Sequence, residues 1–311
     1  MKILRYLLKH MVPIFWGVSV IPFYMAWVFA TQKLFPTYIL DLLTGTASTS
    51  ANVNEFLLFG FGLFALGPFL GGFTLLYNDY WDSEIDATSR RKGLFPLPQG
   101  LLKPKTVLWT SLLLMSLALV FSFLVSLLFG FLVIFCIILS LAYSTPPVRL
   151  KNRAGLDVIT NAFGSGLLCS IAGWIVVKPF MEYPWIWGLT SMSGVAAIYI
   201  PTTIIDYESD KKAREMTFAV RFGKNTAFFF GTLSVAIANL LIIYMGLTNY
   251  LITTELVTVI WPIALAQVIV YPLILKKMTF KGVYWTILSL SLLLVLGNAL
   301  LLTYYVGWWS L

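Results

Sequence analysis

Charged side chains are scarce in this chain. Asp, Glu, Lys and Arg together make up 11% of its 311 residues, whereas a soluble globular domain carries about a quarter. Hydrophobic residues make up 59%, and the mean hydropathy is +0.87. This composition excludes an ordinary soluble domain. The recurring apolar stretches of roughly 20 residues are long enough to cross a bilayer as helices.

Histidine and cysteine are also rare. His10 is the only histidine, and Cys136 and Cys169 lie in apolar stretches without the Cys-x-x-Cys spacing of a metal site. A histidine relay, a haem site and a thiolate metal centre are therefore not expected, and no Walker-type glycine loop is present. The net charge of +8 is explained better by membrane topology than by nucleic-acid binding. We therefore expect the lipid bilayer as a partner and no nucleic acid.

Nine apolar spans predict an all-α, multi-pass membrane protein that forms a single domain over residues 1–311. The first span follows a basic N-terminal segment. Because no small-x-small cleavage site follows it, we interpret it as a retained membrane helix rather than a signal peptide. The predicted spans are 12–30, 56–77, 107–127, 130–146, 158–177, 185–205, 226–246, 255–275 and 284–306.

The basic residues are distributed very unequally between the two sides of the predicted bundle. When the loops are assigned to alternating sides, every Lys and Arg except Lys33 and Lys178 falls on one side. Cytoplasmic loops are enriched in Lys and Arg. The sequence therefore predicts a cytoplasmic N-terminus and an external C-terminus.

A first group of acidic residues follows the second span directly, on the predicted cytoplasmic side. Asn78, Asp82 and Asp86 are spaced four residues apart, so a helix that continues out of the span places them on one stripe. Asp79 lies close to the same face. Carboxylates at this spacing repel one another, and near a membrane they are costly unless they are paired or hydrated.

A second group, Asp206 and Asp210, follows the sixth span with the same spacing. Two such clusters need a compensating cation, and Mg²⁺ is typically held by a few carboxylates together with substrate phosphates. We therefore predict Mg²⁺ as the cofactor, bridging a diphosphate to both groups, with solvated helix ends as the alternative. The predicted metal ligands are Asn78, Asp82, Asp86, Asp206 and Asp210, and the predicted catalytic residues are Asp79, Asp82, Asp206 and Asp210.

A turn with two prolines ends the fourth span and holds Tyr143, Arg149 and Lys151 at the predicted level of the aspartates. Asp157 and Asn161, four residues apart at the start of the fifth span, are either functional or interhelical hydrogen-bonding groups. Basic residues beside both acidic groups can contact phosphate oxygens, although membrane topology already explains them. The predicted substrate-binding residues are Asn78, Arg90, Lys92, Tyr143, Arg149, Lys151, Asn161 and Lys211.

These motifs resemble those of the UbiA superfamily of intramembrane prenyltransferases. Segment 78–86 reads Asn-x-x-x-Asp-x-x-x-Asp, like the first family motif, and segment 206–210 reads Asp-x-x-x-Asp, like the second. Segment 143–151, Tyr-Ser-Thr-Pro-Pro-Val-Arg-Leu-Lys, resembles the interhelical loop of the family. The resemblance covers nearly the whole chain. One departure is Arg214, where many members have glycine.

The resemblance implies Mg²⁺-dependent transfer of a prenyl group from a polyprenyl diphosphate to a lipophilic acceptor, in a cytoplasm-facing active-site cavity of the nine-helix bundle. We expect an aromatic, quinone-precursor-type acceptor, with a carotenoid or another isoprenoid or tetrapyrrole as the alternative. Outside the enzyme class, a transporter of a divalent cation or a polyprenyl phosphate would carry acids near the bilayer midplane. Here the acids gather at one end of the spans, which favours an enzyme.

Overall fold

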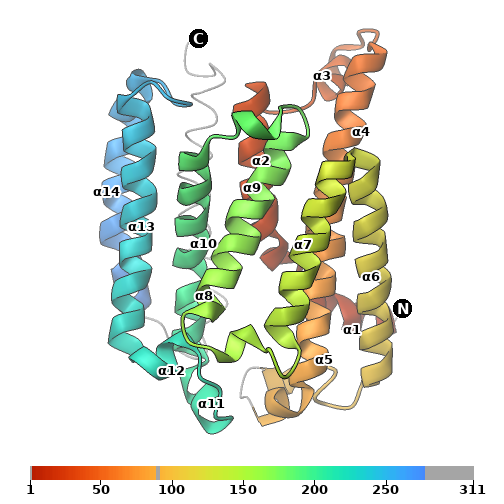
Figure 1. The fold of residues 1–311 in the computed structure, drawn as a ribbon, viewed down its shortest axis with the longest axis vertical. Helices are drawn as coiled ribbons and strands as arrows, with labels where there is room; N and C mark the ends of the chain where they lie inside the picture. The colour runs from red at the N-terminus through yellow and green to blue at the C-terminus, as the bar shows by residue number, and fades with distance from the viewer. Residues whose placement is uncertain (1, 89–91, 277–311) are drawn as a thin grey trace. The chain divides into compact units, whose positions relative to one another are not determined.

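The computed structural model of the chain describes residues 2–88 and 92–276, and within these ranges it contains helices and no strand (Figure 1). The predicted all-α class is confirmed for this part of the chain. The ninth predicted span, 284–306, lies outside the described residues, so the count of nine helices stays a prediction. In chain order the α-helices are α1 (Lys2–Met11), α2 (Gly17–Thr31), α3 (Thr37–Thr44), α4 (Ser50–Phe64), α5 (Gly72–Thr88), α6 (Pro104–Val125), α7 (Leu127–Ser144), α8 (Leu156–Asn161), α9 (Cys169–Ile175), α10 (Trp185–Ile205), α11 (Tyr207–Lys212), α12 (Phe218–Phe222), α13 (Lys224–Leu247) and α14 (Thr254–Lys276).

Six helical segments in the described residues are long and apolar enough to cross a membrane. They coincide with the second to the seventh predicted spans. Two shorter apolar helices, Gly17–Thr31 and Ile260–Leu273, coincide with the first and the eighth. The six segments are Ser50–Ala87, Pro104–Val125, Leu127–Ser144, Leu156–Ile175, Trp185–Ile205 and Lys224–Leu247.

The longest of these segments carries the first acidic motif. Helix α4, the π-helical turn η2 (Ala65–Gly71) and α5 continue into one another, with Pro68 inside η2, and together they make up the 38-residue segment Ser50–Ala87 and one further residue, Thr88, which ends α5. At 1.5 Å per residue this helix measures about 57 Å, roughly twice the hydrocarbon thickness of a bilayer. The acidic motif at its C-terminal end therefore lies beyond the predicted span of 56–77, on a helix that continues out of that span as predicted.

The third and fourth predicted spans are divided at Ser126. This residue has an extended backbone, and its hydroxyl accepts a hydrogen bond from the N–H of Phe129 at 3.1 Å, which caps the start of α7. Serine is a preferred N-cap residue because its side chain satisfies an otherwise unpaired helical N–H. The helices therefore separate slightly before the predicted break between residues 127 and 130.

The described chain divides into two compact units. The first unit comprises Met1–Trp27, Pro36–Lys151 and Leu168–Tyr183. Within it, α5 packs against α6, α6 packs against α7, and the N-terminal helix α1 packs against α5. A cluster of buried apolar side chains joins α1 to α5 and α6; its members are Leu7, Met11, Leu76, Leu97, Leu102 and Val107.

The second unit comprises Val28–Phe35, Asn152–Leu167 and, among the described residues, 184–276. Within it, α10 packs against α13, α13 packs against α14, and α8 packs against α10. Ala197, Val235, Tyr271 and Leu275 form a buried cluster there. The hydroxyl of Tyr271 donates a hydrogen bond to the carbonyl of Ala197, so this phenol is satisfied inside the apolar core.

Candidate active site

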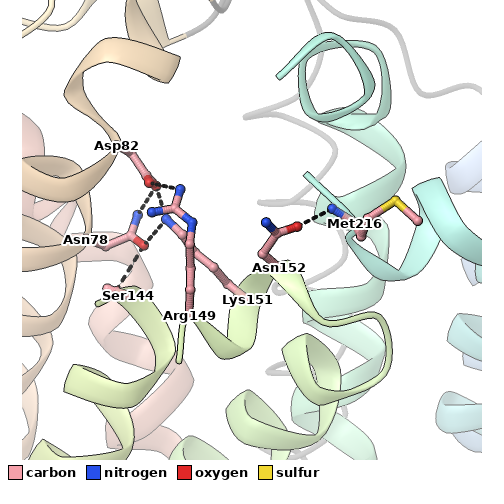
Figure 2. Close-up of polar contacts among 7 residues, drawn as sticks. All are labelled: Asn78, Asp82, Ser144, Arg149, Lys151, Asn152 and Met216. Carbon is pink, nitrogen blue, oxygen red and sulfur yellow. Dashed lines mark hydrogen bonds and ion pairs between the residues drawn. The ribbon is translucent and has the colours of Figure 1, made fainter. Parts of the chain in front are cut away.

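The first acidic motif extends from the middle of α5 to near its C-terminal end. Asp82 and Asp86 are each only 7% exposed, and Asn78 is half-buried. The side-chain amide of Asn78 donates a hydrogen bond to Oδ2 of Asp82 at 3.0 Å, which is possible because residues four apart lie on the same helix face (Figure 2). Asp82 is thus a buried carboxylate whose position is fixed from its own helix.

The segment that follows α7 brings two cations to Asp82. Figure 2 shows the guanidinium of Arg149 donating to Oδ1 of Asp82 at 2.9 Å, while the ammonium of Lys151 contacts Oδ2. The ammonium also donates to Oδ1 of Asn78 at 2.9 Å, and the hydroxyl of Ser144 donates to that same oxygen at 3.2 Å. Two cationic side chains thus meet at this carboxylate, and such cations can also contact the oxygens of a diphosphate.

The backbone of Arg149 is strained in a way that supports this geometry. Its φ of 37° lies in the left-handed region, which costs a non-glycine residue about 1–3 kcal/mol. Two prolines at 146 and 147 end α7, and the N–H of Arg149 then donates to the carbonyl of Thr145 at 2.9 Å. The turn directs both cationic side chains, from Arg149 and from the short helix η4 (Leu150–Asn152), onto α5.

Asp79 has a partner that sequence reasoning missed. Nδ1 of His10 lies 2.8 Å from Oδ2 of Asp79, and Nε2 of His10 accepts a hydrogen bond from the N–H of Leu97 at 3.0 Å. Because Nε2 presents its lone pair to Leu97, Nδ1 carries the ring proton and donates it to Asp79. His10 is 1% exposed. It therefore joins α1, α5 and the 95–102 turn at a predicted catalytic residue.

The second acidic motif lies where α10 gives way to α11. Asp206 has φ −85° and ψ 1°, which breaks the helix, yet its carbonyl still accepts from the N–H of Asp210 at 2.8 Å. Both aspartates are half-buried. Oδ2 of Asp210 accepts a hydrogen bond from the hydroxyl of Thr217 at 3.0 Å. Asp206 and Asp210 are therefore still joined by a helical i, i+4 hydrogen bond, despite the bend at Asp206.

The basic residues beside the second motif are exposed. The ammonium of Lys224 bonds Glu208 at 2.9 Å, and this bond together with its charge lowers the pKa of that carboxyl. Both side chains are open to solvent, so the pair adds little to stability. Lys224 and Lys211 lie 4.3 and 5.8 Å from the centre of the Tyr207 ring. Lys211, a predicted substrate-binding residue, thus lies on a solvated face of α11.

Arg214, the residue that departs from the family pattern, has a backbone conformation that favours glycine. Its φ is 58°, in the left-handed region that glycine adopts without a steric penalty. The loop after α11 therefore has a left-handed backbone conformation at position 214, although the residue there is arginine and not glycine.

Asp157 and Asn161 have structural partners in the second unit. Oδ1 of Asp157 accepts from the N–H groups of Gly155 and Val158 at 2.8 and 2.9 Å, and Oδ2 accepts from the N–H of Phe218 at 2.7 Å. Asp157 is fully buried. The amide of Asn161 donates to the carbonyl of Asp157 at 2.8 Å. Of the two readings of this pair from sequence, these contacts favour the hydrogen-bonding one.

Three predicted substrate-binding residues remain. Tyr143 is half-buried near the end of α7. Arg90 lies outside the described residues. Lys92 is described only as backbone, at the start of the short helix η3 (Lys92–Leu94), so its side chain also lies outside the description.

The donor set fits a hard divalent cation. In the described part of the chain, no three His, Cys, Asp or Glu side chains form a ready-made metal cluster. The oxygens of Asn78 and Asp82 nevertheless converge on one cation, the ammonium of Lys151, and Asp86 lies on the same helix stripe. Mg²⁺ usually keeps few protein ligands and completes its shell with phosphates and water. The oxygen donors of these residues are of the kind that Mg²⁺ binds.

Comparisons with known proteins place the chain in a family. The model of the UbiA prenyltransferase family matches residues 33–275. Protoheme IX farnesyltransferase of Archaeoglobus fulgidus is 28% identical over 157 residues, which are 49% of this chain and 53% of that protein. Homogentisate phytyltransferase of Synechocystis is 26% identical over 206 residues, which are 64% of this chain and 65% of that protein. The chain thus spans about half to two thirds of the length of the curated relatives it matches.

The fold agrees with this assignment. A UbiA homolog from Archaeoglobus fulgidus bound to GPP and Mg²⁺ superposes with a TM-score of 0.69 and 22% identity, over 98% of this chain and all of that one. At this identity the likeness shows a shared fold. Because the family model covers well over half of the residues, this chain is a member of the UbiA prenyltransferase family.

Proposed function

We propose that this protein transfers a prenyl group from a prenyl diphosphate to a lipophilic acceptor in the membrane. The observation that carries the proposal is the buried carboxylate of Asp82, which the cations of Arg149 and Lys151 flank at an acidic motif. Such a group can hold a metal while the cations contact phosphate oxygens. The solved UbiA homolog bound to GPP and Mg²⁺ supports this choice of substrate and metal.

Each predicted residue except Asn161, whose amide bonds the carbonyl of Asp157, has a proposed role. Mg²⁺ neutralises the charge that develops on the departing diphosphate. Arg149, Lys151 and Tyr143 bind the diphosphate from the α7–η4 turn, and Arg90, Lys92 and Lys211 supply further contacts. His10 orients Asp79 beside the metal ligands. The proposed metal ligands are Asn78, Asp82 and Asp86 from the first motif and Asp206 and Asp210 from the second.

We propose an aromatic, quinone-precursor-type acceptor. The relative named for homogentisate, an aromatic compound, supports this choice. A carotenoid or another isoprenoid or tetrapyrrole acceptor is the alternative, and the relative named for protoheme IX supports the tetrapyrrole. We also propose nine spans with a cytoplasmic N-terminus, an external C-terminus and the active site on the cytoplasmic side, on the strength of the distribution of Lys and Arg.

The test is a transfer assay with the purified protein in lipid nanodiscs. Labelled GPP or a longer prenyl diphosphate is incubated with aromatic, isoprenoid and tetrapyrrole acceptors, with Mg²⁺ or with excess chelator. We expect product with Mg²⁺ and none with chelator. Asp82→Asn and Asp210→Asn should each lower turnover roughly a hundredfold or more, since even second-shell partners of metal sites cost up to that much.

Lys105→Met, which changes an exposed lysine of α6, is the matched control and should retain full turnover. Full activity in chelator would exclude the metal from the reaction. If no acceptor is prenylated but the nanodiscs bind prenyl phosphate, the protein is not a transferase for these substrates.

A further inference from the structure

We infer that the ammonium of Lys151 occupies the metal position of the first acidic motif when no metal is bound. A divalent metal ion that binds Oδ1 of Asn78 and Oδ2 of Asp82 then displaces it. This inference rests on the proposed function, because it concerns the metal proposed there. It assigns Lys151 a second role besides diphosphate binding. It also predicts that removing this lysine strengthens metal binding.

The geometry of the ammonium carries the inference. Nζ of Lys151 contacts Oδ2 of Asp82 and lies 2.9 Å from Oδ1 of Asn78, so two oxygens of the motif converge on it. Lys151 is 8% exposed. A lysine whose only task was to meet a diphosphate would extend its ammonium toward the substrate. Here the ammonium lies between the motif residues, as Figure 2 shows.

The motif cannot hold the ammonium and a divalent ion through the same oxygens. Mg²⁺ binds carboxylate oxygens at about 2.1 Å, so an ion on Oδ2 of Asp82 and Oδ1 of Asn78 would fall where Nζ of Lys151 lies. Two like charges this close repel strongly at low dielectric. Lys151 must therefore withdraw when the metal binds through these atoms.

Arg149 donates to the other carboxylate oxygen, Oδ1 of Asp82, and this bond does not occupy the position between Oδ2 of Asp82 and Oδ1 of Asn78. The motif thus keeps one cation and exchanges the other. Lysine suits exchange, since its charge is a compact point on a flexible stem, whereas the guanidinium of arginine is held in a rigid fork. Once withdrawn, the Lys151 ammonium becomes available to the diphosphate that accompanies the metal.

The inference predicts the direction in which Lys151 changes the metal affinity. Metal binding has to break the contacts of Lys151 with Asn78 and Asp82. The free energy of these contacts therefore reduces the net free energy of metal binding. Replacing Lys151 with an uncharged residue of similar length removes that competitor. A residue that only helped to build the metal site would have the opposite effect, because its loss would weaken metal binding.

The experiment measures Mn²⁺ binding directly, by electron paramagnetic resonance of free Mn²⁺, on full-length protein in nanodiscs without prenyl diphosphate. Mn²⁺ is used because it shares the oxygen-ligand preference of Mg²⁺. We expect Lys151→Met to bind Mn²⁺ at least about fivefold more tightly than the wild type, the lower end of usual coupling between two sites. Lys105→Met should leave the affinity unchanged, and Asp82→Asn should lower it.

Equal or weaker Mn²⁺ binding by Lys151→Met would overturn the inference, and it would leave the transferase proposal standing if the wild type still makes prenylated product. If Lys151→Met does not fold, Lys151→Gln serves in its place, since its amide can still donate to Asn78 without a charge. The same tighter binding is expected from it, and unchanged affinity again rejects the inference.

Discussion

The role of His10 depends on tertiary structure, because its hydrogen-bond partners are distant in the sequence. Its ring donates to Asp79 and accepts from the N–H of Leu97, and all three groups are buried or nearly so. His10→Ala would leave a buried carboxylate and a buried N–H without this partner. We expect a loss of about 1–3 kcal/mol in unfolding free energy, the usual penalty for an unsatisfied buried polar group. Thermal unfolding in detergent measures it.

Two further variants separate the hydrogen bonds from the packing of α1. His10→Gln should retain part of the stability, because the amide nitrogen and oxygen can donate to Asp79 and accept from Leu97 much as the ring does. Arg5→Ala, on the exposed face of the same helix, should be neutral. If His10→Gln is as unstable as His10→Ala, the ring contributes through its shape rather than through these two hydrogen bonds.

The sequence predicted some residues of the site better than others. Asn78 and Asp82 could be paired in advance because both lie on one helix, where residues four apart share a face. Arg149 and Lys151 were predicted to lie level with the aspartates because a double proline had to turn the chain there. His10 could not be connected with Asp79, which is 69 residues away, since no periodicity relates the two segments.

Among the structural elements, α8 and α12 contribute Val158 and Ala219 to one buried apolar cluster, and the side chain of Asp157 links them by a hydrogen bond. The carboxylate of Asp157 accepts three backbone N–H groups, one of them from Phe218 at the start of α12. Asp157→Asn has only one acceptor oxygen, so its NH₂ group must face at least one of these N–H donors. We expect it to lower the unfolding free energy by about 1–3 kcal/mol, with turnover intact below the unfolding temperature.

Unfolding temperature and turnover should be measured on the same preparations. Glu182→Gln is the control, because it makes the same acid-to-amide change on an exposed side chain and should alter neither quantity. A loss of turnover at full stability in Asp157→Asn would instead place this carboxylate in the reaction.

The sequence predicted the positions of the membrane spans but not the division of the N-terminal segment or the π-helical turns. The apolar runs located spans because a helix must satisfy its own backbone in lipid. The N-terminal segment was not resolved into elements: α1 ends at Met11, Val12 has a φ of 37°, and a separate helix α2 begins at Gly17. The π-helical turns η2 and η5 (Ala162–Leu168) were also missed, because hydropathy is insensitive to a change in backbone winding.

On the scale of the whole molecule, the distribution of Lys and Arg predicts the orientation in the membrane. A reporter fused to the N-terminus, or inserted after Gln99 in the turn before α6, should read as cytoplasmic. A reporter at the C-terminus should read as external. Protease protection in sealed vesicles provides an independent measurement. Nine crossings place the two ends of the chain on opposite sides of the membrane. A cytoplasmic C-terminus together with a cytoplasmic N-terminus would therefore reject the count of nine spans.

The contacts of Lys151 with Asn78 and Asp82 also protect its amine from chemical modification. An amine is acylated when its free lone pair attacks the acyl carbon of the reagent, and this ammonium is buried and donates to two oxygens. Lys103, Lys105, Lys178 and Lys212 are exposed, and Lys151 is the one buried lysine among the side chains that the structure describes. Brief acetylation followed by mass spectrometry of the peptides should therefore mark those lysines and spare Lys151. Its degree of acetylation would then report how often this side chain leaves the motif.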